Sequence, residues 1–283
     1  MKNKIYKSLS ASKRLLPINF RTFIRYYLTR AKLLNKISKL PNWRLNYLGD
    51  KVYMADGFIT SHDTPFLRND KLVSAYEAAL RDLEDFYVVP NSRYRQDSWE
   101  SSKEIIWRAH IVTWAAKTVE KLEGDFVECG VGNGLLSKTI CHYLEFEKQD
   151  RNFYLLDCWE LFREENWDRL YPRHEDITWF DFAASRFSQF PNVTLVKGMI
   201  PKSLEMVKNI NKVAYLSIDM NDGEPEIAAL KFFWPKLVPG AIVYFDDYLW
   251  GYPKLQKYVE DFLLDKDVEL LHIPTGNSIL IKN

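Results

Sequence analysis

The chain has 283 residues with a formal net charge of +1, and 47% of its residues are apolar while 27% are charged. This composition is typical of a globular protein and excludes disorder over most of the chain. No apolar stretch is long enough for a membrane span or a signal segment, and the three cysteines lack the spacing of a disulfide framework or a zinc site, so we expect a soluble cytoplasmic protein.

The first 40 residues carry eleven Lys or Arg and no Asp or Glu, so the rest of the chain is net acidic. One interpretation is an arm that packs on the acidic remainder through charge attraction. Another is peripheral contact of residues 1–40 with an anionic membrane surface, because apolar residues such as Leu15, Phe20 and Phe23 accompany the basic ones. We expect no nucleic-acid partner, because no recognition motif accompanies the charge.

Residues 1–95 are predicted to form an irregular, mainly helical N-terminal extension, and residues 96–283 the main domain. Proline and glycine interrupt the pattern throughout the first segment. One helix is predicted there, over residues 70–86, because apolar residues recur at helical spacing from Leu72 to Leu83.

The main domain begins with a predicted helix from Asp97 or Ser98, either of which can cap it, to about Leu122, with Gly124 ending it. Strands and helices then alternate. The predicted strands cover residues 125–129, 153–156, 193–196, 213–218 and 241–245. The predicted helices begin near residues 135, 176, 201, 224 and 253. This alternation indicates a parallel sheet with helices on both faces.

The chain ends in a predicted hairpin of residues 268–272 and 278–281, which would add antiparallel strands to the sheet edge. The sequence therefore predicts an α/β, Rossmann-like fold with a mostly parallel, seven-stranded sheet.

A glycine-rich turn, residues 128–134, lies between the first predicted strand of the sheet and its helix, which is a ligand position in open α/β sheets. It reads E-x-G-x-G-x-G, whereas dinucleotide sites prefer G-x-G-x-x-G. Glu128 would repel a pyrophosphate but suits the ammonium group of S-adenosylmethionine, which carries no phosphate. The predicted cofactor-binding residues of the turn are Glu128, Gly130, Gly132 and Gly134.

Two further residues are predicted to contact a nucleoside. Asp157 ends the second strand, where an acidic side chain typically holds ribose hydroxyls. Both NAD and S-adenosylmethionine contain that ribose, so Asp157 does not choose between them. Gly198 follows the third strand and is expected near the adenine end.

Three aspartates follow two strands that we expect to be neighbours, namely Asp219 after the fourth strand and Asp246 and Asp247 after the fifth. Carboxylates suit Mg²⁺, and a bound ion can orient a diol and lower the pKa of one hydroxyl. The alternative is that these residues only cap the following helices. Asn221, Asp222 and Glu224 in the next loop could position the substrate or act as base. The predicted catalytic residues are Asp219, Asp222 and Glu224.

Several segments resemble the macrocin O-methyltransferase (TylF-like) family. They are residues 124–131, Asp219-Met220-Asn221, Pro225-Glu226, Phe233-Trp234, residues 237–240, Asp246-Asp247-Tyr248 and Pro274-Thr275-Gly276. The resemblance runs from about Trp107 to Lys282. The chain departs from the family pattern at residues 132–135, at Cys158-Trp159 and at Asn277-Ser278.

The resemblance implies a class I methyltransferase that uses S-adenosylmethionine and usually Mg²⁺, with hydroxyls of sugars, glycosylated natural products or glycans as acceptors. By motif position it gives Asp219, Asp246 and Asp247 the metal role. The alternatives are an NAD-dependent oxidoreductase and a non-catalytic protein that binds a nucleoside cofactor. The oligomeric state stays open, with a homo-oligomer among the forms that we allow.

Overall fold

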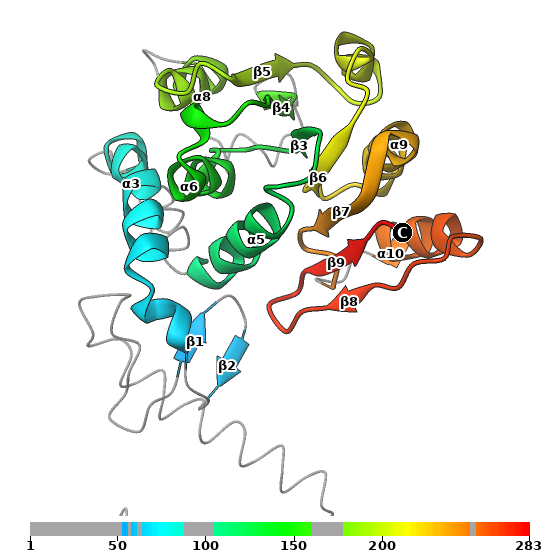
Figure 1. Ribbon diagram of the computed structural model, residues 1–283, viewed down its shortest axis with the longest axis horizontal. Coiled ribbons are helices and arrows are strands. Elements are labelled where there is room, and N and C mark those ends of the chain that lie inside the picture. Colours follow the sequence, from blue (N-terminus) through cyan, green and yellow to red (C-terminus); the bar gives the residue numbers. More distant parts are fainter. Residues whose placement is uncertain (1–52, 56–57, 61–63, 88–104, 160–177, 250–252) are drawn as a thin grey trace, which may run out of the picture. The chain divides into compact units, whose positions relative to one another are not determined.

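The computed structural model describes residues 53–55, 58–60, 64–87, 105–159, 178–249 and 253–283 (Figure 1). The predictions for the basic segment 1–40 and for the start of a helix at Asp97 or Ser98 lie outside the described residues. Two short strands, β1 (Tyr53–Ala55) and β2 (Phe58–Thr60), form a sheet of their own. None of the helices in the described part of the chain combines the length and apolar character that a membrane span needs.

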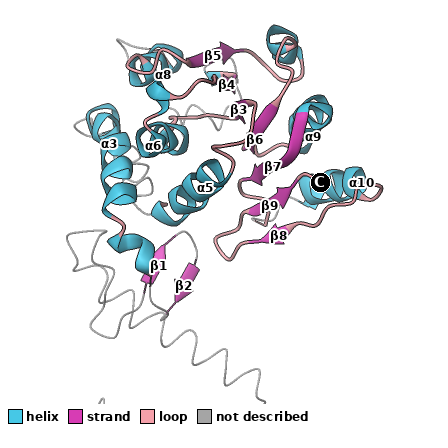
Figure 2. Ribbon diagram, in the orientation of Figure 1, coloured by secondary structure: helices cyan, strands magenta, loops and turns pink. Residues whose placement is uncertain are grey.

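A seven-stranded sheet forms the centre of the larger compact unit, which contains residues 64–283 (Figure 2). Its strands are β3 (Asp125–Cys129), β4 (Phe153–Asp157), β5 (Val193–Lys197), β6 (Val213–Ile218), β7 (Leu237–Phe245), β8 (Leu271–His272) and β9 (Ser278–Ile281). Their order across the sheet is β5-β4-β3-β6-β7-β9-β8. The first five strands run parallel, and β9 pairs antiparallel with both β7 and β8. The predicted Rossmann-like fold is therefore confirmed.

Helices cover both faces of this sheet (Figure 1). One face carries α5 (Ile106–Thr118), α6 (Leu135–Leu144) and α8 (Trp179–Phe187), and α3 (Asp70–Tyr87) packs on α6. The other face carries α9 (Gly223–Phe233) and α10 (Pro253–Leu263), which pack on each other. Because α3 belongs to the same compact unit as the sheet, the predicted helix at residues 70–86 is part of the main body.

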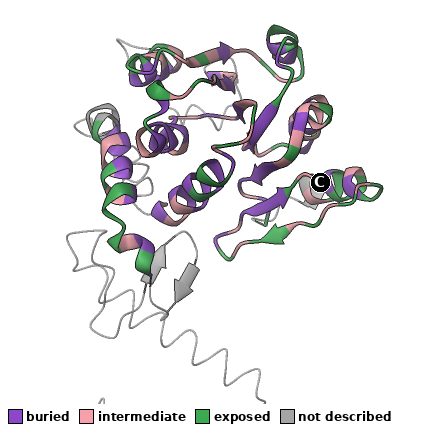
Figure 3. Cartoon of the chain, viewed as in Figure 1, coloured by how far each residue is buried: buried purple, intermediate pink, exposed green. Residues whose placement is uncertain are grey.

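The central strands are buried on both sides, as expected for strands between two helical layers (Figure 3). Every residue of β6 is buried, and so are Val127 on β3, Leu156 on β4 and Val243 on β7. Burying a side chain of this size contributes roughly 1.5–3 kcal/mol. A rigid sheet of this kind fixes the ends of its strands, which is where the candidate site lies.

Some predicted boundaries were wrong. The helix predicted to reach Leu122 ends at Thr118, because the chain turns at Val119, whose carbonyl accepts from the Leu122 amide at 2.9 Å. The helix predicted from Pro201 is a 3-10 helix, Lys202–Val207. In the terminal hairpin only Leu271–His272 pairs with β9. The strand predicted from residue 241 begins at Leu237, because Leu237 already pairs with Val213.

Candidate active site

The site lies at the edge of the sheet where β3, β4, β6 and β7 end, because parallel strands bring their carboxyl ends to one rim. Ladder hydrogen bonds continue to this rim. The Asp219 amide donates to the Cys129 carbonyl at 2.8 Å, and the Asp246 amide donates to the Ile218 carbonyl at 3.0 Å. The rim holds two groups of predicted residues, the glycine-rich turn after β3 and the acidic cluster Asp219, Asp246 and Asp247.

The glycine-rich turn requires glycine at two positions for reasons of space. Gly130 has φ +90°, and a Cβ added to it would lie 1.7 Å from the Asp219 carbonyl oxygen. Gly134 has φ +72°, and its added Cβ would lie 2.7 Å from the Phe187 ring. Gly132 has φ +53°. These backbone conformations favour glycine, and the first contact ties the turn to the acidic cluster.

Asp157 braces this turn. One of its carboxylate oxygens accepts from the amides of Val131 at 2.7 Å and Gly132 at 2.8 Å, and the other accepts from the Trp159 amide at 2.6 Å. Burial raises its pKa, although the three backbone donors act in the opposite direction. The Cys158 side chain also hydrogen-bonds to this carboxylate and lowers its pKa.

Trp159 and Gly198 complete the surroundings of Asp157. The Trp159 indole donates from Nε1 to the Gly132 carbonyl at 3.2 Å and so lies against the glycine-rich turn. The Gly198 amide donates to the Asp157 carbonyl at 2.9 Å. A Cβ at Gly198 would lie 2.9 Å from Cβ of Ser203, so close packing also explains this glycine. The structure thus brings Asp157 and Gly198 together.

Glu128 is the buried carboxylate beneath the turn, and this residue is 4% exposed. Burial raises its pKa well above the usual range, and the nearby Asp246 and Asp157 raise it further. A buried carboxylate is stabilised in its charged form when a cation binds beside it. This position therefore suits a cationic ligand group and disfavours an anionic one.

The three predicted metal ligands converge. One carboxylate oxygen from each of Asp219, Asp246 and Asp247 lies within 4.8 Å of the others. Burial raises the pKa of Asp219 well above its usual range, and the charges of Asp246 and Asp247 add to this shift. Asp247 has φ +49°, a backbone conformation that is unusual outside glycine and often occurs at functional sites. The donor set is hard, negatively charged and close enough for Mg²⁺, so the residues fit that ion.

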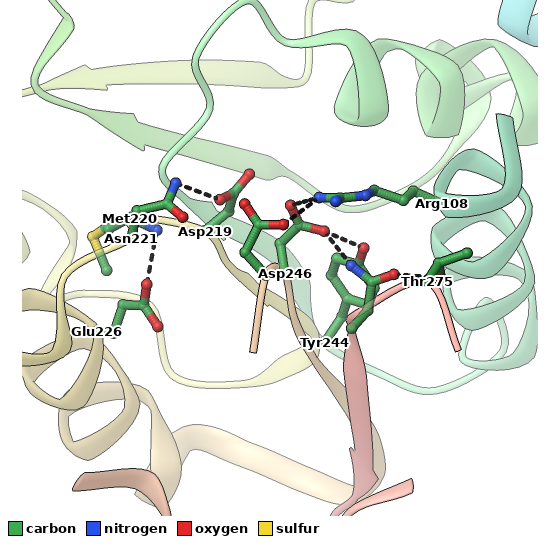
Figure 4. A network of polar contacts seen from close by, with 10 residues as sticks. Arg108, Asp219, Met220, Asn221, Glu226, Tyr244, Asp246 and Thr275 are labelled. Carbon is green, nitrogen blue, oxygen red and sulfur yellow. Dashed lines mark hydrogen bonds and ion pairs between the residues drawn. The ribbon is translucent and has the colours of Figure 1, made fainter. Parts of the chain in front are cut away.

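Three residues that we did not predict hold the acidic cluster in place (Figure 4). Nη1 of Arg108, on α5, contacts Oδ2 of Asp246 and lies 2.8 Å from Oδ1 of Asp247. The Tyr244 hydroxyl and the Asn277 amide both donate to Oδ1 of Asp246, at 2.5 Å and 2.6 Å. An arginine among the apolar residues of a predicted helix was the sequence signal for Arg108. No local signal marked Tyr244 or Asn277.

Of the three predicted catalytic residues, Asp219 belongs to the acidic cluster, whereas Asp222 and Glu224 do not. Asp222 is exposed and caps α9, where its carboxylate accepts from the Glu224 amide at 3.3 Å. Glu224 is also exposed and lines a shallow groove with Ile227 and Lys231, among others. Neither side chain belongs to the acidic cluster.

Glu226, by contrast, is buried and was not predicted as a site residue. Its Oε1 accepts from the Met220 amide at 3.1 Å, which anchors the loop that carries Asp219 (Figure 4). Burial raises the pKa of Glu226 to about 8, against the opposing effect of its backbone donors.

Comparison with known proteins relates part of the chain to methyltransferases. Residues 127–248 match the family model described as a methyltransferase domain. No curated protein matches the chain. Among solved structures, the O-methyltransferase NovP is 20% identical with a TM-score of 0.55, and the match covers 76% of this chain and 100% of NovP.

Two other structures are more distant. CalS11, a TDP-rhamnose 3'-O-methyltransferase, is 16% identical with a TM-score of 0.47, and the match covers 78% of this chain and 96% of CalS11. The Podospora anserina methyltransferase PaMTH1, bound to SAH, is 13% identical with a TM-score of 0.49, over 76% of this chain and 88% of PaMTH1. The likeness to NovP shows the fold.

Proposed function

We propose that the chain is an S-adenosylmethionine-dependent, Mg²⁺-dependent O-methyltransferase that acts on a hydroxyl of a sugar, a glycosylated natural product or a glycan. One observation carries this proposal. The acidic cluster Asp219, Asp246 and Asp247 converges within 4.8 Å beside the glycine-rich turn, within a segment that matches a methyltransferase domain.

The cofactor would lie at the glycine-rich turn. Its residues would be Glu128, Gly130, Gly132, Gly134, Asp157 and Gly198. Glu128 would face the ammonium group, since its buried carboxylate is stabilised by a cation. Asp157 would accept from a ribose hydroxyl with the oxygen that takes the Trp159 amide. NAD is disfavoured, because its pyrophosphate would lie close to Glu128.

Asp219, Asp246 and Asp247 would hold the Mg²⁺ ion. When bound, the ion supplies Lewis acidity that lowers the pKa of an acceptor hydroxyl. Neighbouring side chains hold and orient the aspartates that would bind the ion. The Tyr244 hydroxyl and the Asn277 amide fix one oxygen of Asp246, and Glu226 fixes the loop that carries Asp219.

In the transfer itself, the acceptor oxygen forms a bond to the methyl carbon while the bond from that carbon to sulfur breaks, which leaves S-adenosylhomocysteine. The acceptor proton leaves to solvent or to a nearby carboxylate. Asp222 and Glu224 stay the candidates predicted for this role from the sequence, although Asp222 caps α9 and neither side chain belongs to the acidic cluster. The sugar class of acceptor rests on the TylF-like motifs, and transfer to oxygen is also the activity of NovP, which shares this fold.

The proposal is tested by transfer of a radiolabelled methyl group from S-adenosylmethionine to a panel of sugar nucleotides and glycans. We expect labelled product with Mg²⁺, none in EDTA, and recovery when Mg²⁺ is restored. Full transfer in EDTA would contradict the metal role. Reduction of NAD by any panel member would favour the oxidoreductase alternative. Binding of the cofactor without transfer to any acceptor would favour a non-catalytic binding protein.

A further inference from the structure

Arg108 places a positive charge inside the acidic cluster. Its side chain is 10% exposed, and those of Asp246 and Asp247 are 4% and 24% exposed. Nη1 contacts both carboxylates at once, as Figure 4 shows for Arg108 and Asp246. Because the guanidinium does not lose its proton in proteins, this charge is permanent.

Two of the three carboxylates that would hold a metal cation are thus already paired with the positive charge of Arg108. If all four groups are ionised, the cluster has three negative charges and one positive charge. That leaves a net negative charge for a divalent ion, but Arg108 and the ion would share Asp246 and Asp247. Like charges at such short range repel strongly where water is largely excluded.

We propose that Arg108 is an internal counter-ion that competes with the divalent cation for Asp246 and Asp247 and thereby weakens cation binding. This inference rests on the proposed function, in which those aspartates hold Mg²⁺. In the metal-free protein Arg108 offsets one of the negative charges of the cluster. When the cation binds, Arg108 gives up at least one of its two carboxylates.

Asp247 is the carboxylate that changes partner. Asp246 is held at its other oxygen by Tyr244 and Asn277, so it stays in place without Arg108. Among the described residues, only Arg108 gives the Asp247 side chain an ion pair or hydrogen bond. Asp247 is also the more exposed of the two, so its carboxylate is the less costly one to move.

The test measures Mn²⁺ affinity by calorimetry in the full chain, with Arg108→Met against the wild type. Lys117→Met is the matched control, because Lys117 lies on the same helix, carries the same charge and pairs with Glu120 on the surface. We expect Arg108→Met to bind Mn²⁺ about tenfold more tightly or better, since it removes a cation from direct contact with the ligands. Lys117→Met should bind as the wild type does.

Thermal melting gives a second readout. Without metal, Arg108→Met should melt below the wild type, because its carboxylates have lost their counter-ion, and Mn²⁺ should raise its melting temperature by more than it raises that of the wild type. If Arg108→Met does not fold, Arg108→Gln decides, and tighter Mn²⁺ binding is expected because a neutral amide does not repel the ion.

The outcomes separate the two proposals. Unchanged or weaker Mn²⁺ binding in the variant that folds, with a wild type that binds Mn²⁺, overturns the competition and leaves the proposed function standing. Binding by the variant alone supports the competition. No Mn²⁺ binding by any of these proteins overturns both the metal role and the competition.

Discussion

Gly130 and the backbone carbonyl of Asp219 lie in direct contact, so close that a Cβ on Gly130 would come within 1.7 Å of the Asp219 oxygen. The first residue is in the glycine-rich turn, and the second begins the loop of the acidic cluster. The two parts of the candidate site therefore share one backbone contact, and a change at Gly130 is expected to disturb both.

Gly130→Ala should abolish or strongly weaken the binding of S-adenosylhomocysteine. The added Cβ has to displace the Asp219 backbone, and at φ +90° the residue itself costs about 1–2 kcal/mol. Calorimetry measures the affinity, and thermal melting measures the stability. Gly240→Ala is the matched control, since Gly240 also has a positive φ, +84°, but its Cβ meets only a flexible leucine side chain. Both variants should have a lower melting temperature than the wild type. Normal S-adenosylhomocysteine affinity in Gly130→Ala would contradict the account.

Asp157→Ala should weaken S-adenosylhomocysteine binding by about 1–3 kcal/mol. The variant loses hydrogen bonds to the ribose, and it also loses those that fix the backbone of the glycine-rich turn. Asp157→Asn should lose less, because its amide oxygen can still accept from the turn amides. Calorimetric titration gives both affinities. Asp181→Ala, an exposed aspartate on α8, should bind as the wild type does. Equal affinity of Asp157→Ala and the wild type would remove Asp157 from the cofactor site.

Much of the fold and of the candidate site could be predicted from the sequence, wherever the signal lies within a few neighbouring residues. The strand before the glycine-rich turn and the start of α6 at Leu135 lie at their predicted positions, because an apolar run and closely spaced glycines mark them within a few residues. The placement of three aspartates at one rim also followed, since neighbouring parallel strands must end together.

The rest depends on contacts between distant segments. Arg108 and Asp246 are 138 positions apart, and Asn277 and Asp246 are 31 apart, so no periodic pattern connects them. Asp157 was predicted as a ribose ligand, whereas its three backbone contacts depend on how the turn folds back over β4. The boundary predicted at residue 95 stays a prediction.

Asp219→Asn should weaken Mn²⁺ binding by about tenfold or more and leave S-adenosylhomocysteine affinity within about twofold, because a neutral amide is a poorer ligand for a hard cation. Asp246→Asn should do the same. Calorimetry with each ligand separates the two effects. Asp261→Asn, an exposed aspartate on α10, serves as control. If Asp219→Asn and Asp246→Asn both bind Mn²⁺ normally, the aspartates are not metal ligands.

Glu226→Gln should change how stability depends on pH. The folded-state pKa of Glu226, about 8, lies above its unfolded value, so folding takes up a proton between these values. Its stabilising contribution is complete below the unfolded pKa and is lost as pH rises toward 8. Glutamine keeps an oxygen for the Met220 amide and does not titrate.

Chemical denaturation in EDTA from about pH 5 to about pH 9 brackets this titration. The free energy of unfolding of the wild type should fall relative to Glu226→Gln with rising pH, by at most about 1.4 kcal/mol per pH unit for one proton. Parallel curves for the two proteins would show that Glu226 is ionised throughout this range and would contradict a raised pKa.

The central claim is that the glycine-rich turn and its carboxylates bind S-adenosylmethionine and not a dinucleotide. One calorimetric comparison tests it most directly, with S-adenosylhomocysteine and NAD titrated in turn into the wild-type chain. The account predicts saturable one-to-one binding of S-adenosylhomocysteine and no detectable heat from NAD. Saturable binding of NAD without binding of S-adenosylhomocysteine would contradict it.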